Sequence, residues 1–235
     1  MEPRVVSRDE WVAARKAFLA EEREFTKARD RLSERRRELP WVKVDKEYVF
    51  DGPNGKESLS DLFAGKSQLI VQHFMFDPSW DAGCKSCSFW ADNFNGIIVH
   101  LNQRDVSMVM VSKAPLATLQ AFQKRMGWTF KWVSSLHNDF NRDYHVSFTP
   151  EELQQGRAYY NYKEDTAFPV SEAPGISVFR KDDSGAKFHT YSCYARGLDM
   201  LNSAYHLLDL VPKGRDEKGL PHTMSWVRLH DQYGS

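Results

Sequence analysis

The stretch from Ser67 to Leu101 constrains the fold of this chain more than any other part of it. It opens with SQLIVQHFMF, an apolar run of strand length that predicts a buried strand. DPSWDAG follows, and its Asp, Pro, Ser and Gly residues are typical of a loop. The last part, CKSCSFWADNFNGIIVHL, has apolar residues at helical spacing. The stretch therefore predicts a strand–loop–helix unit with Cys84 and Cys87 in the first turn of the helix.

Two cysteines with this spacing at the start of a helix favour redox chemistry. The unpaired N–H groups and the helix dipole stabilise an anion there, so a Cys84 thiolate is favoured, and Lys85 adds a nearby cation. Cys87 lies one turn further along, within reach of a disulfide with Cys84. Two other interpretations stay open. The pair could be ordinary core cysteines, or it could bind a metal ion. The metal site is disfavoured because there is no second C-x-x-C and Cys193 stands alone.

Composition excludes several classes of protein. The chain has 235 residues, 41% of them hydrophobic and 13% aromatic, which is enough for one elaborated globular domain. The 32 basic and 32 acidic residues cancel, so no net charge attracts nucleic acid or an anionic membrane. No apolar run reaches the length of a membrane-spanning helix, and the N-terminus lacks the apolar core of a secretory signal. Three cysteines are too few for a disulfide scaffold, so we expect a cytoplasmic protein.

Three segments are expected along the chain. Residues 1–40 predict a helical extension, because Ser7 and Glu10 form a capping box and Pro40 ends the helical pattern. One stripe of this helix is apolar, with a bulky residue at every seventh position: Trp11, Phe18, Phe25, Leu32 and Leu39. It predicts packing on the same domain or a homodimer contact. Residues 41–211 form the main domain, and residues 212–235 are expected to pack on it as a C-terminal tail.

The main domain alternates strands and helices before the pattern changes. Strands are expected at residues 106–111 and 130–133, with a helix opened by Pro115 between them. Residues 136–170 are rich in aromatic side chains and predict an insertion packed over the core. A hairpin follows at residues 176–194 and then a final helix.

This order of elements resembles the thioredoxin fold, an α/β fold with a central mixed sheet flanked by helices. Cys84, Cys87 and the Ala173-Pro174 pair before the hairpin carry the resemblance. It implies a cis Pro174 facing the cysteines, with Ala173 offering its backbone to a substrate. It also implies a proton-relay group where His73 stands, although the thioredoxin family has an acid there. Over nearly its full length the chain is similar to a bacterial thioredoxin-like family of unknown function, through GCKSCSFWADNFNG and the closing WVRLHDQY.

The leading functional prediction is a dithiol-disulfide oxidoreductase that needs no cofactor or metal. Cys84 would attack a protein or small-molecule disulfide and Cys87 would resolve the mixed disulfide, with Pro174 and His73 completing the catalytic group. The alternative is a binding module or metal carrier that only retains the fold. A peroxiredoxin would need a hydroxyl residue where Asp81 stands, which disfavours a peroxidase.

Four residues around the motif are expected to bind the substrate. They are Trp80, Lys85, Ser86 and Ala173.

Overall fold

The computed structural model describes residues 4–234 and divides the chain into two compact units, Met1–Pro40 and Trp41–Ser235. Within residues 4–234, no helix combines the length and apolar character needed to cross a membrane.

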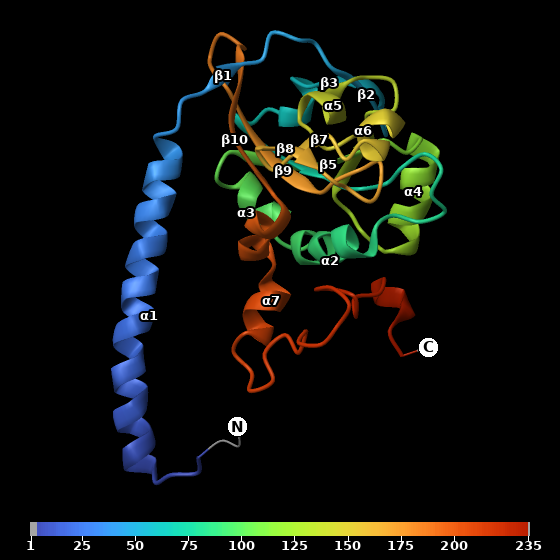
Figure 1. The fold of residues 1–235 in the computed structure, drawn as a ribbon. Coiled ribbons are helices and arrows are strands. Elements are labelled where there is room, and N and C mark those ends of the chain that lie inside the picture. Colours follow the sequence, from blue (N-terminus) through green and yellow to red (C-terminus); the bar gives the residue numbers. More distant parts are fainter. Residues whose placement is uncertain (1–3, 235) are drawn as a thin grey trace. The chain divides into compact units, whose positions relative to one another are not determined.

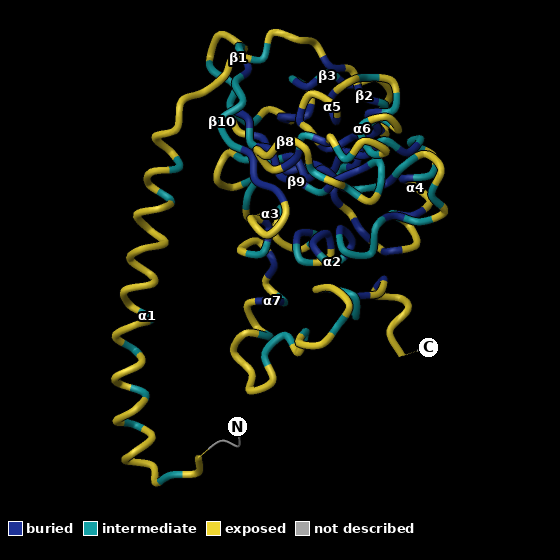
Figure 2. The backbone as a smooth tube through the Cα atoms, viewed as in Figure 1, coloured by how far each residue is buried: buried dark blue, intermediate teal, exposed yellow. Residues whose placement is uncertain are grey.

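The first unit is a single long helix, α1 (Arg8–Arg37). The predicted capping box is confirmed: the Ser7 hydroxyl accepts the Glu10 N–H, and the Glu10 carboxylate accepts the Ser7 N–H at 3.0 Å. Three arginines in the last turn complement the negative end of the helix dipole. None of the residues of α1 is buried, and Figure 2 shows the helix as mostly exposed with a few residues of intermediate burial.

The second unit is built on a sheet that has eight strands within the described residues, in the order β1-β10-β9-β4-β5-β6-β2-β3. The strands, in chain order, are β1 (Val42–Lys43), β2 (Val49–Gly52), β3 (Gly55–Ser58), β4 (Gln68–His73), β5 (Val106–Ser112), β6 (Lys131–Ser134), β9 (Gly175–Lys181) and β10 (Lys187–Tyr194). The α-helices of this unit are α2 (Lys85–Phe94), α3 (Ile98–Asn102), α4 (Leu116–Arg125), α5 (Phe140–Asp143), α6 (Pro150–Gln154) and α7 (Ser203–Leu208). Three 3₁₀ turns complete it: η1 (Asp61–Phe63), η2 (Ala195–Leu201) and η3 (His230–Gln232).

The four central strands have the topology of a thioredoxin-like fold. β4 and β5 are parallel and are joined through α2 and α3, while β9 pairs antiparallel with β4 and forms a hairpin with β10 (Figure 1). This β-α-β unit followed by an antiparallel hairpin is the arrangement expected from the sequence. The remaining strands extend the sheet at both edges into the predicted mixed sheet.

Two separate cores lie on the two faces of this sheet. On the face that packs against α2 and α4, aromatic residues such as Trp90, Phe122 and Trp132 fill the space between helices and strands. The opposite face holds a second core with Phe63, Phe140 and other buried residues of η1 and α5. We call the first one the α2 face. Because side chains alternate along a strand, neighbouring residues of β4 contribute to different cores.

The aromatic-rich segment at residues 136–170 forms a layer of its own. It contains α5, α6 and an antiparallel pair, β7 (Ala158–Tyr160) and β8 (Lys163–Thr166). Phe148 and Tyr160 pack with Ala173 and Tyr194 in a third small core, which joins the segment to the start of β9 and the end of β10. The insertion therefore lies at the end of the sheet where β9 starts and β10 ends, which is also where the predicted site lies.

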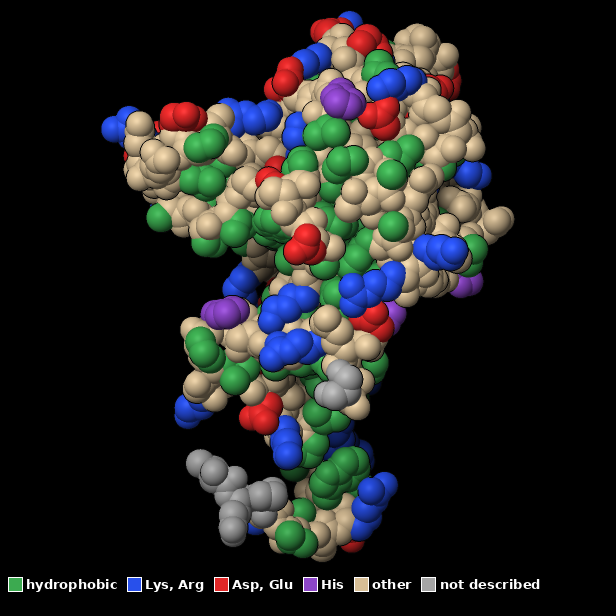
Figure 3. Space-filling model, turned by 90° about the vertical axis from the view of Figure 1, so that its right-hand side faces the viewer, with side chains coloured by type: hydrophobic (Ala, Val, Ile, Leu, Met, Phe, Trp, Pro, Cys, Tyr) green, Lys and Arg blue, Asp and Glu red, His purple; other side chains and the backbone are tan. Residues whose placement is uncertain are grey.

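The surface carries interspersed charges of both signs. Figure 3 shows Lys and Arg side chains mixed with Asp and Glu over the face that it presents, without a broad area of one sign. This matches the zero formal net charge of the chain.

Candidate functional site

The two cysteines stand at the start of α2, where the end of β4 meets the helix. Cys84 is the N-cap residue, and its N–H donates to the Met75 carbonyl at 3.0 Å. The Met75 N–H points at the Cys87 sulfur at 3.5 Å. The loop after β4 therefore holds both ends of the C-x-x-C turn, as the strand–loop–helix pattern predicted. Both Cys84 and Cys87 are thiols in this structure.

The environments of the two sulfurs push their pKa values in opposite directions. A hydrogen bond from the Cys87 thiol lowers the pKa of Cys84 to about 6, with help from the backbone N–H groups of Cys87 and Ser86 and against the effect of burial. Burial raises the pKa of Cys87 well above its usual value, and the hydrogen bond and charge of Cys84 raise it further. Cys84 is half-buried and Cys87 is 3% exposed. Cys84 is thus the thiolate and Cys87 its proton-bearing partner.

Lys85 does not point its charge at the thiolate. Its ammonium donates to the Ser225 carbonyl at 3.3 Å, so it fastens the first turn of α2 to the C-terminal part of the chain. The largest cause of the lowered Cys84 pKa is the hydrogen bond from Cys87, and the role of Lys85 as a nearby cation and substrate-binding residue stays a prediction. Ser86 does take part, through its N–H group and as a wall of the cavity described below. Trp80 is half-buried against the core of the α2 face and is not among the residues lining that cavity.

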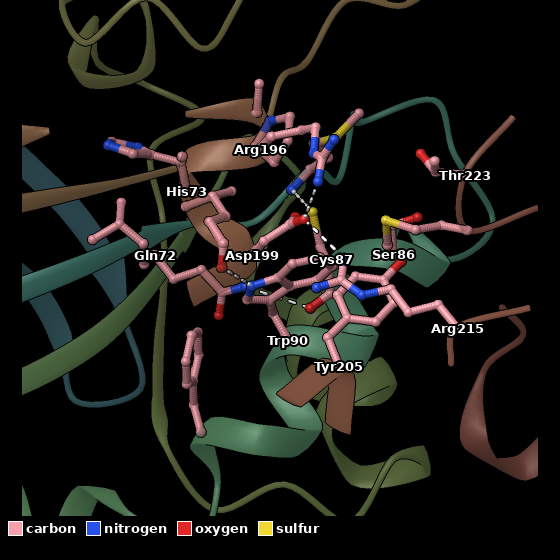
Figure 4. A pocket seen from close by; sticks show the side chains of 18 of the residues that line it. Gln72, His73, Ser86, Cys87, Trp90, Arg196, Asp199, Tyr205, Arg215 and Thr223 are labelled. Carbon is pink, nitrogen blue, oxygen red and sulfur yellow. Dashed lines mark hydrogen bonds and ion pairs between the residues drawn. The ribbon is translucent and has the colours of Figure 1, made fainter. Parts of the chain in front are cut away.

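The position predicted for His73, beneath Cys87, is wrong. Gln72 occupies that place: its side-chain amide donates to the Cys87 carbonyl at 3.4 Å, and Figure 4 shows it directed toward Cys87 while His73 points away. The His73 ring lies on the opposite face of the sheet, stacked on Tyr144 and hydrogen-bonded to Ser177 at 2.8 Å. Burial lowers the pKa of His73 to about 3, so the ring is neutral. His73 and Gln72 are adjacent in β4, and alternation sends only one of them to the cysteines.

Pro174 lies at the site, but the details predicted for it are corrected. Pro174 and Gly175 line the same cavity as Cys87. Among the described residues every peptide bond is trans, including the one before Pro174, so the predicted cis bond is wrong. The backbone of this junction is also occupied: the Ala173 N–H donates to the Val146 carbonyl at 2.8 Å, and the Pro174 carbonyl accepts the Tyr160 hydroxyl at 2.8 Å. Ala173 therefore does not offer its N–H to a substrate.

Glu172 is a functional candidate that the sequence interpretation missed. Its carboxyl group is 3% exposed and accepts hydrogen bonds from Ser147 at 2.6 Å and Asn141 at 3.1 Å. Burial raises the pKa of Glu172 to about 7 despite these bonds and the positive charge of Lys113. Its charge in turn contributes to the raised pKa of Cys87. A buried acid two residues before Pro174 was the available signal, but its burial is not visible in the sequence.

A cavity of about 660 Å³ opens beside Cys87. Its floor is formed by Gln72 and Ile176 of the sheet, one wall by Trp90 and Phe94 of α2, and the opposite wall by residues between Ala195 and Met224. Figure 4 shows Gln72, Trp90 and Asp199 around Cys87 in this cavity.

The C-terminal segment, residues 209–234, closes one side of this cavity by packing on α2. Besides the Lys85 bond, Trp226 contacts Phe89 with ring centroids 5.7 Å apart, and His230 hydrogen-bonds to Asp92 at 2.8 Å. Val227 is completely buried. Glu217 stabilises the conformation of this segment. One of its carboxylate oxygens accepts hydrogen bonds from the Tyr205 hydroxyl, the Met224 N–H and the Trp226 indole N–H. The predicted C-terminal tail therefore forms part of the site.

The structure also gives the position of the third cysteine and bears on the interpretation of the cysteine pair as a metal site. Cys193 on β10 pairs with Ile176 on β9 and is buried in the core of the α2 face, a position typical of a structural cysteine. Within residues 4–234, no group of three or more His, Cys, Asp or Glu side chains is arranged to hold a metal ion.

Comparison with protein families supplies the identity of the chain. The model of a bacterial protein family of unknown function, DUF899, matches residues 1–233. The chain belongs to this family. No curated protein matches the chain. The DUF899 chain resembles peroxidoxin BcpB from Mycobacterium tuberculosis at 12% identity and a TM-score of 0.48, over 70% of this chain and 94% of that one.

A second solved structure, the bacterioferritin comigratory protein of Xanthomonas campestris, matches at 12% identity and a TM-score of 0.45. The match covers 66% of this chain and 88% of the Xanthomonas chain, and that structure was studied for its alkyl peroxide reduction activity. Because both TM-scores are below 0.5, the thioredoxin-like fold of the DUF899 chain rests on its strand topology.

Proposed function

We propose that this protein is a thiol-disulfide oxidoreductase that uses Cys84 as nucleophile and Cys87 as resolving thiol. The observation that carries the proposal is the placement of Cys84 as the N-cap of α2 with Cys87 in its first turn. The hydrogen bond from Cys87 lowers the pKa of Cys84 to about 6, while burial raises the pKa of Cys87. An ionised sulfur beside a protonated one is the state that thiol–disulfide exchange requires. A reducing compartment such as the cytosol would keep the pair in this dithiol form.

The formation of a mixed disulfide would itself activate the second step. Cys84 loses its negative charge when its sulfur is bonded to the substrate, so one of the causes that raise the pKa of Cys87 disappears. What then still opposes ionisation of Cys87 is its burial and the charge of Glu172. We assign Glu172 the role of setting the pH at which Cys87 attacks.

Three single variants test the proposal in a disulfide-reduction assay driven by excess dithiothreitol. We expect Cys84→Ala to lower the rate to background, a loss of about 1,000-fold or more, because no other ionised thiol stands at the site. Cys87→Ser, mixed with a disulfide substrate after dithiothreitol has been removed, should accumulate a covalent adduct on Cys84, detected by mass spectrometry of the intact protein. Cys193→Ala is the matched control, and it should keep most of the activity. Equal activity in Cys84→Ala and the wild type would overturn the proposal.

We also propose that a second copy of this chain covers the apolar stripe of α1. Trp11, Phe18, Phe25, Leu32 and Leu39 are between 44% and 71% exposed and recur every seven residues, the repeat that two packed helices share. Exposed bulky residues in one continuous stripe are characteristic of interaction surfaces.

Sedimentation velocity tests this pairing. The double variant Phe18→Glu/Phe25→Glu is expected to sediment as a monomer where the wild type sediments as a dimer. Ala13→Glu/Ala20→Glu adds the same charges on a different side of α1, at positions that are also exposed, and should remain dimeric. A monomeric wild type, or two variants that dissociate alike, would contradict the proposal.

A further inference from the structure

The cavity beside Cys87 has the properties of a site for a small molecule. Its walls near the sulfur are apolar, formed by Met75, Trp90, Ile176, Leu198 and Met224. A volume of about 660 Å³ lies within the range typical of small-ligand pockets. Of the two reacting thiols, Cys87 lines this apolar chamber, and Cys84 lies within hydrogen-bond distance of Cys87.

One polar atom in the floor of this cavity has no partner. Gln72 is 4% exposed, and although its amide nitrogen donates to the Cys87 carbonyl, its Oε1 atom accepts no hydrogen bond. Leaving a buried acceptor without a donor costs about 1–3 kcal/mol. A ligand that brings a hydroxyl or amide N–H to the Gln72 Oε1 atom would remove this cost.

Two of the backbone groups that a polypeptide could pair with at this site already have partners. A thioredoxin-like protein is expected to present the residues around Pro174 to an extended substrate chain. In this structure the Ala173 N–H already donates a hydrogen bond to the Val146 carbonyl, and the Pro174 carbonyl already accepts one from the Tyr160 hydroxyl. The same Tyr160 oxygen also accepts the Ala195 N–H at 3.0 Å, which joins the insertion to the cavity wall. The insertion thus fills the place that a protein substrate would occupy.

The charged groups of the cavity wall are largely committed to one another. Arg215 forms ion pairs with Asp199 at 2.9 Å and Asp209 at 2.8 Å, and its guanidinium lies 3.9 Å from the centre of the Tyr205 ring. Arg196 pairs with the same Asp199 at 3.4 Å. Because these charges already have partners, binding does not call for a charged ligand.

We propose that the substrate of this site is a small, uncharged organic disulfide with apolar groups and a hydroxyl or amide donor close to its sulfur atoms. This inference rests on the oxidoreductase function proposed above and adds to it the class of substrate. The apolar body lies against Trp90 and Leu198, and the donor group binds Gln72.

The reaction conserves atoms and electrons. The Cys84 thiolate attacks one substrate sulfur, the substrate S–S bond breaks, and the first thiolate leaves and is protonated by water. Cys87 then loses its proton and attacks the Cys84 sulfur, and the second substrate thiolate leaves. The substrate disulfide is reduced to two thiols, while Cys84 and Cys87 are oxidised to a disulfide. Return to the dithiol requires two electrons from an external dithiol reductant.

Calorimetry on the non-reacting Cys84→Ala protein tests the binding step separately from the chemistry. The probes are bis(2-hydroxyethyl) disulfide and dipropyl disulfide, which differ only in a terminal hydroxyl in place of a methyl group. Adding Gln72→Met should weaken binding of the hydroxyl probe by about 5-fold more than that of dipropyl disulfide, as expected for one lost hydrogen bond. The comparison of two probes cancels any general effect of the substitution on the fold. An equal effect on both probes would overturn the role of Gln72.

Activity measurements test the substrate class. Thr223 and His222 are both exposed neighbours in the C-terminal segment, but only Thr223 lines the cavity. Thr223→Trp should raise the KM for bis(2-hydroxyethyl) disulfide about 10-fold or more, whereas His222→Trp should leave it unchanged. The wild type should reduce this probe with a far higher kcat/KM than the disulfides of insulin. Equal reduction of insulin would overturn the substrate class while the oxidoreductase function stands. Probe binding without reduction of any disulfide would instead overturn the function.

Discussion

At pH 7, iodoacetamide is expected to modify Cys84 about 100-fold faster than Cys87. With a pKa of about 6, roughly 90% of Cys84 is thiolate at this pH, whereas Cys87, with its pKa above 9, is less than about 1% ionised. Burial slows Cys87 further, since its side chain is almost inaccessible. The sites and rates of alkylation can be followed by peptide mass spectrometry.

The pH dependence of this reaction identifies the cause of the ionisation. The rate of Cys84 alkylation should rise with pH to a plateau with a midpoint near 6, in place of the ~8.5 of an ordinary thiol. Cys87→Ala removes the largest cause, the hydrogen bond, and should move the midpoint upward. Lys85→Met is the control, and it should move the midpoint less, because Lys85 is bound to the Ser225 carbonyl. A wild-type midpoint at or above 8.5, or faster modification of Cys87, would refute the assigned roles.

The sequence was informative wherever local chemistry decides the structure. The capping box of α1 and the strand–loop–helix unit around Cys84 depend on residues close together in the chain, and both formed as predicted. The thioredoxin-like order of strands followed from the succession of these units.

The sequence could not decide questions that depend on which face of a strand a residue occupies. β4 is buried on both faces, so its apolar residues do not alternate with polar ones and give no sign of direction. Gln72 and His73 were therefore indistinguishable as neighbours of Cys87, and the wrong one was chosen. The Tyr160 and Val146 contacts with the Pro174 junction and the packing of the C-terminal segment on α2 join residues far apart in the chain. No local sequence pattern predicts contacts between residues so far apart in the chain.

Replacing Glu172 with glutamine is expected to stabilise the protein at pH 8 and to have little effect at pH 5. Burial raises the pKa of Glu172 to about 7 from an unfolded value near 4.5, so the folded protein holds this proton more tightly than the unfolded chain. The stability that this tighter proton binding by Glu172 gives the folded protein is fully present below pH 4.5 and is lost as the pH rises through 7. At pH 8 the ionised, buried Glu172 lowers the free energy of unfolding by about 3 kcal/mol. The glutamine variant recovers only part of this, because its uncharged side chain weakens the hydrogen bond with Asn141.

Glu152 provides a matched control of opposite sign. It lies in the insertion that precedes Glu172 in the chain, and its hydrogen bond with Arg142 holds its pKa below the usual value. Its contribution to stability is present above the unfolded pKa and is lost as the pH falls, so Glu152→Gln should destabilise the protein at pH 8. Urea unfolding of both variants at pH 5 and pH 8 measures the two effects. A loss of stability at pH 8 in both variants would contradict the buried, uncompensated charge assigned to Glu172.

The same substitution should change the chemistry of Cys87, which a purely structural role of Glu172 would not do. The charge of Glu172 contributes to the raised pKa of Cys87, so its removal should lower that pKa. Resolution of a mixed disulfide between Cys84 and a chromophoric thiol should then be faster at pH 8, with its pH midpoint shifted downward. Stopped-flow absorbance measures the release of the thiol. An unchanged pH midpoint of mixed-disulfide resolution would show that Glu172 has no role in the reaction. Slower release of the thiol in the glutamine variant would show that Glu172 accepts the Cys87 proton, and that losing this acceptor outweighs the lowered pKa of Cys87.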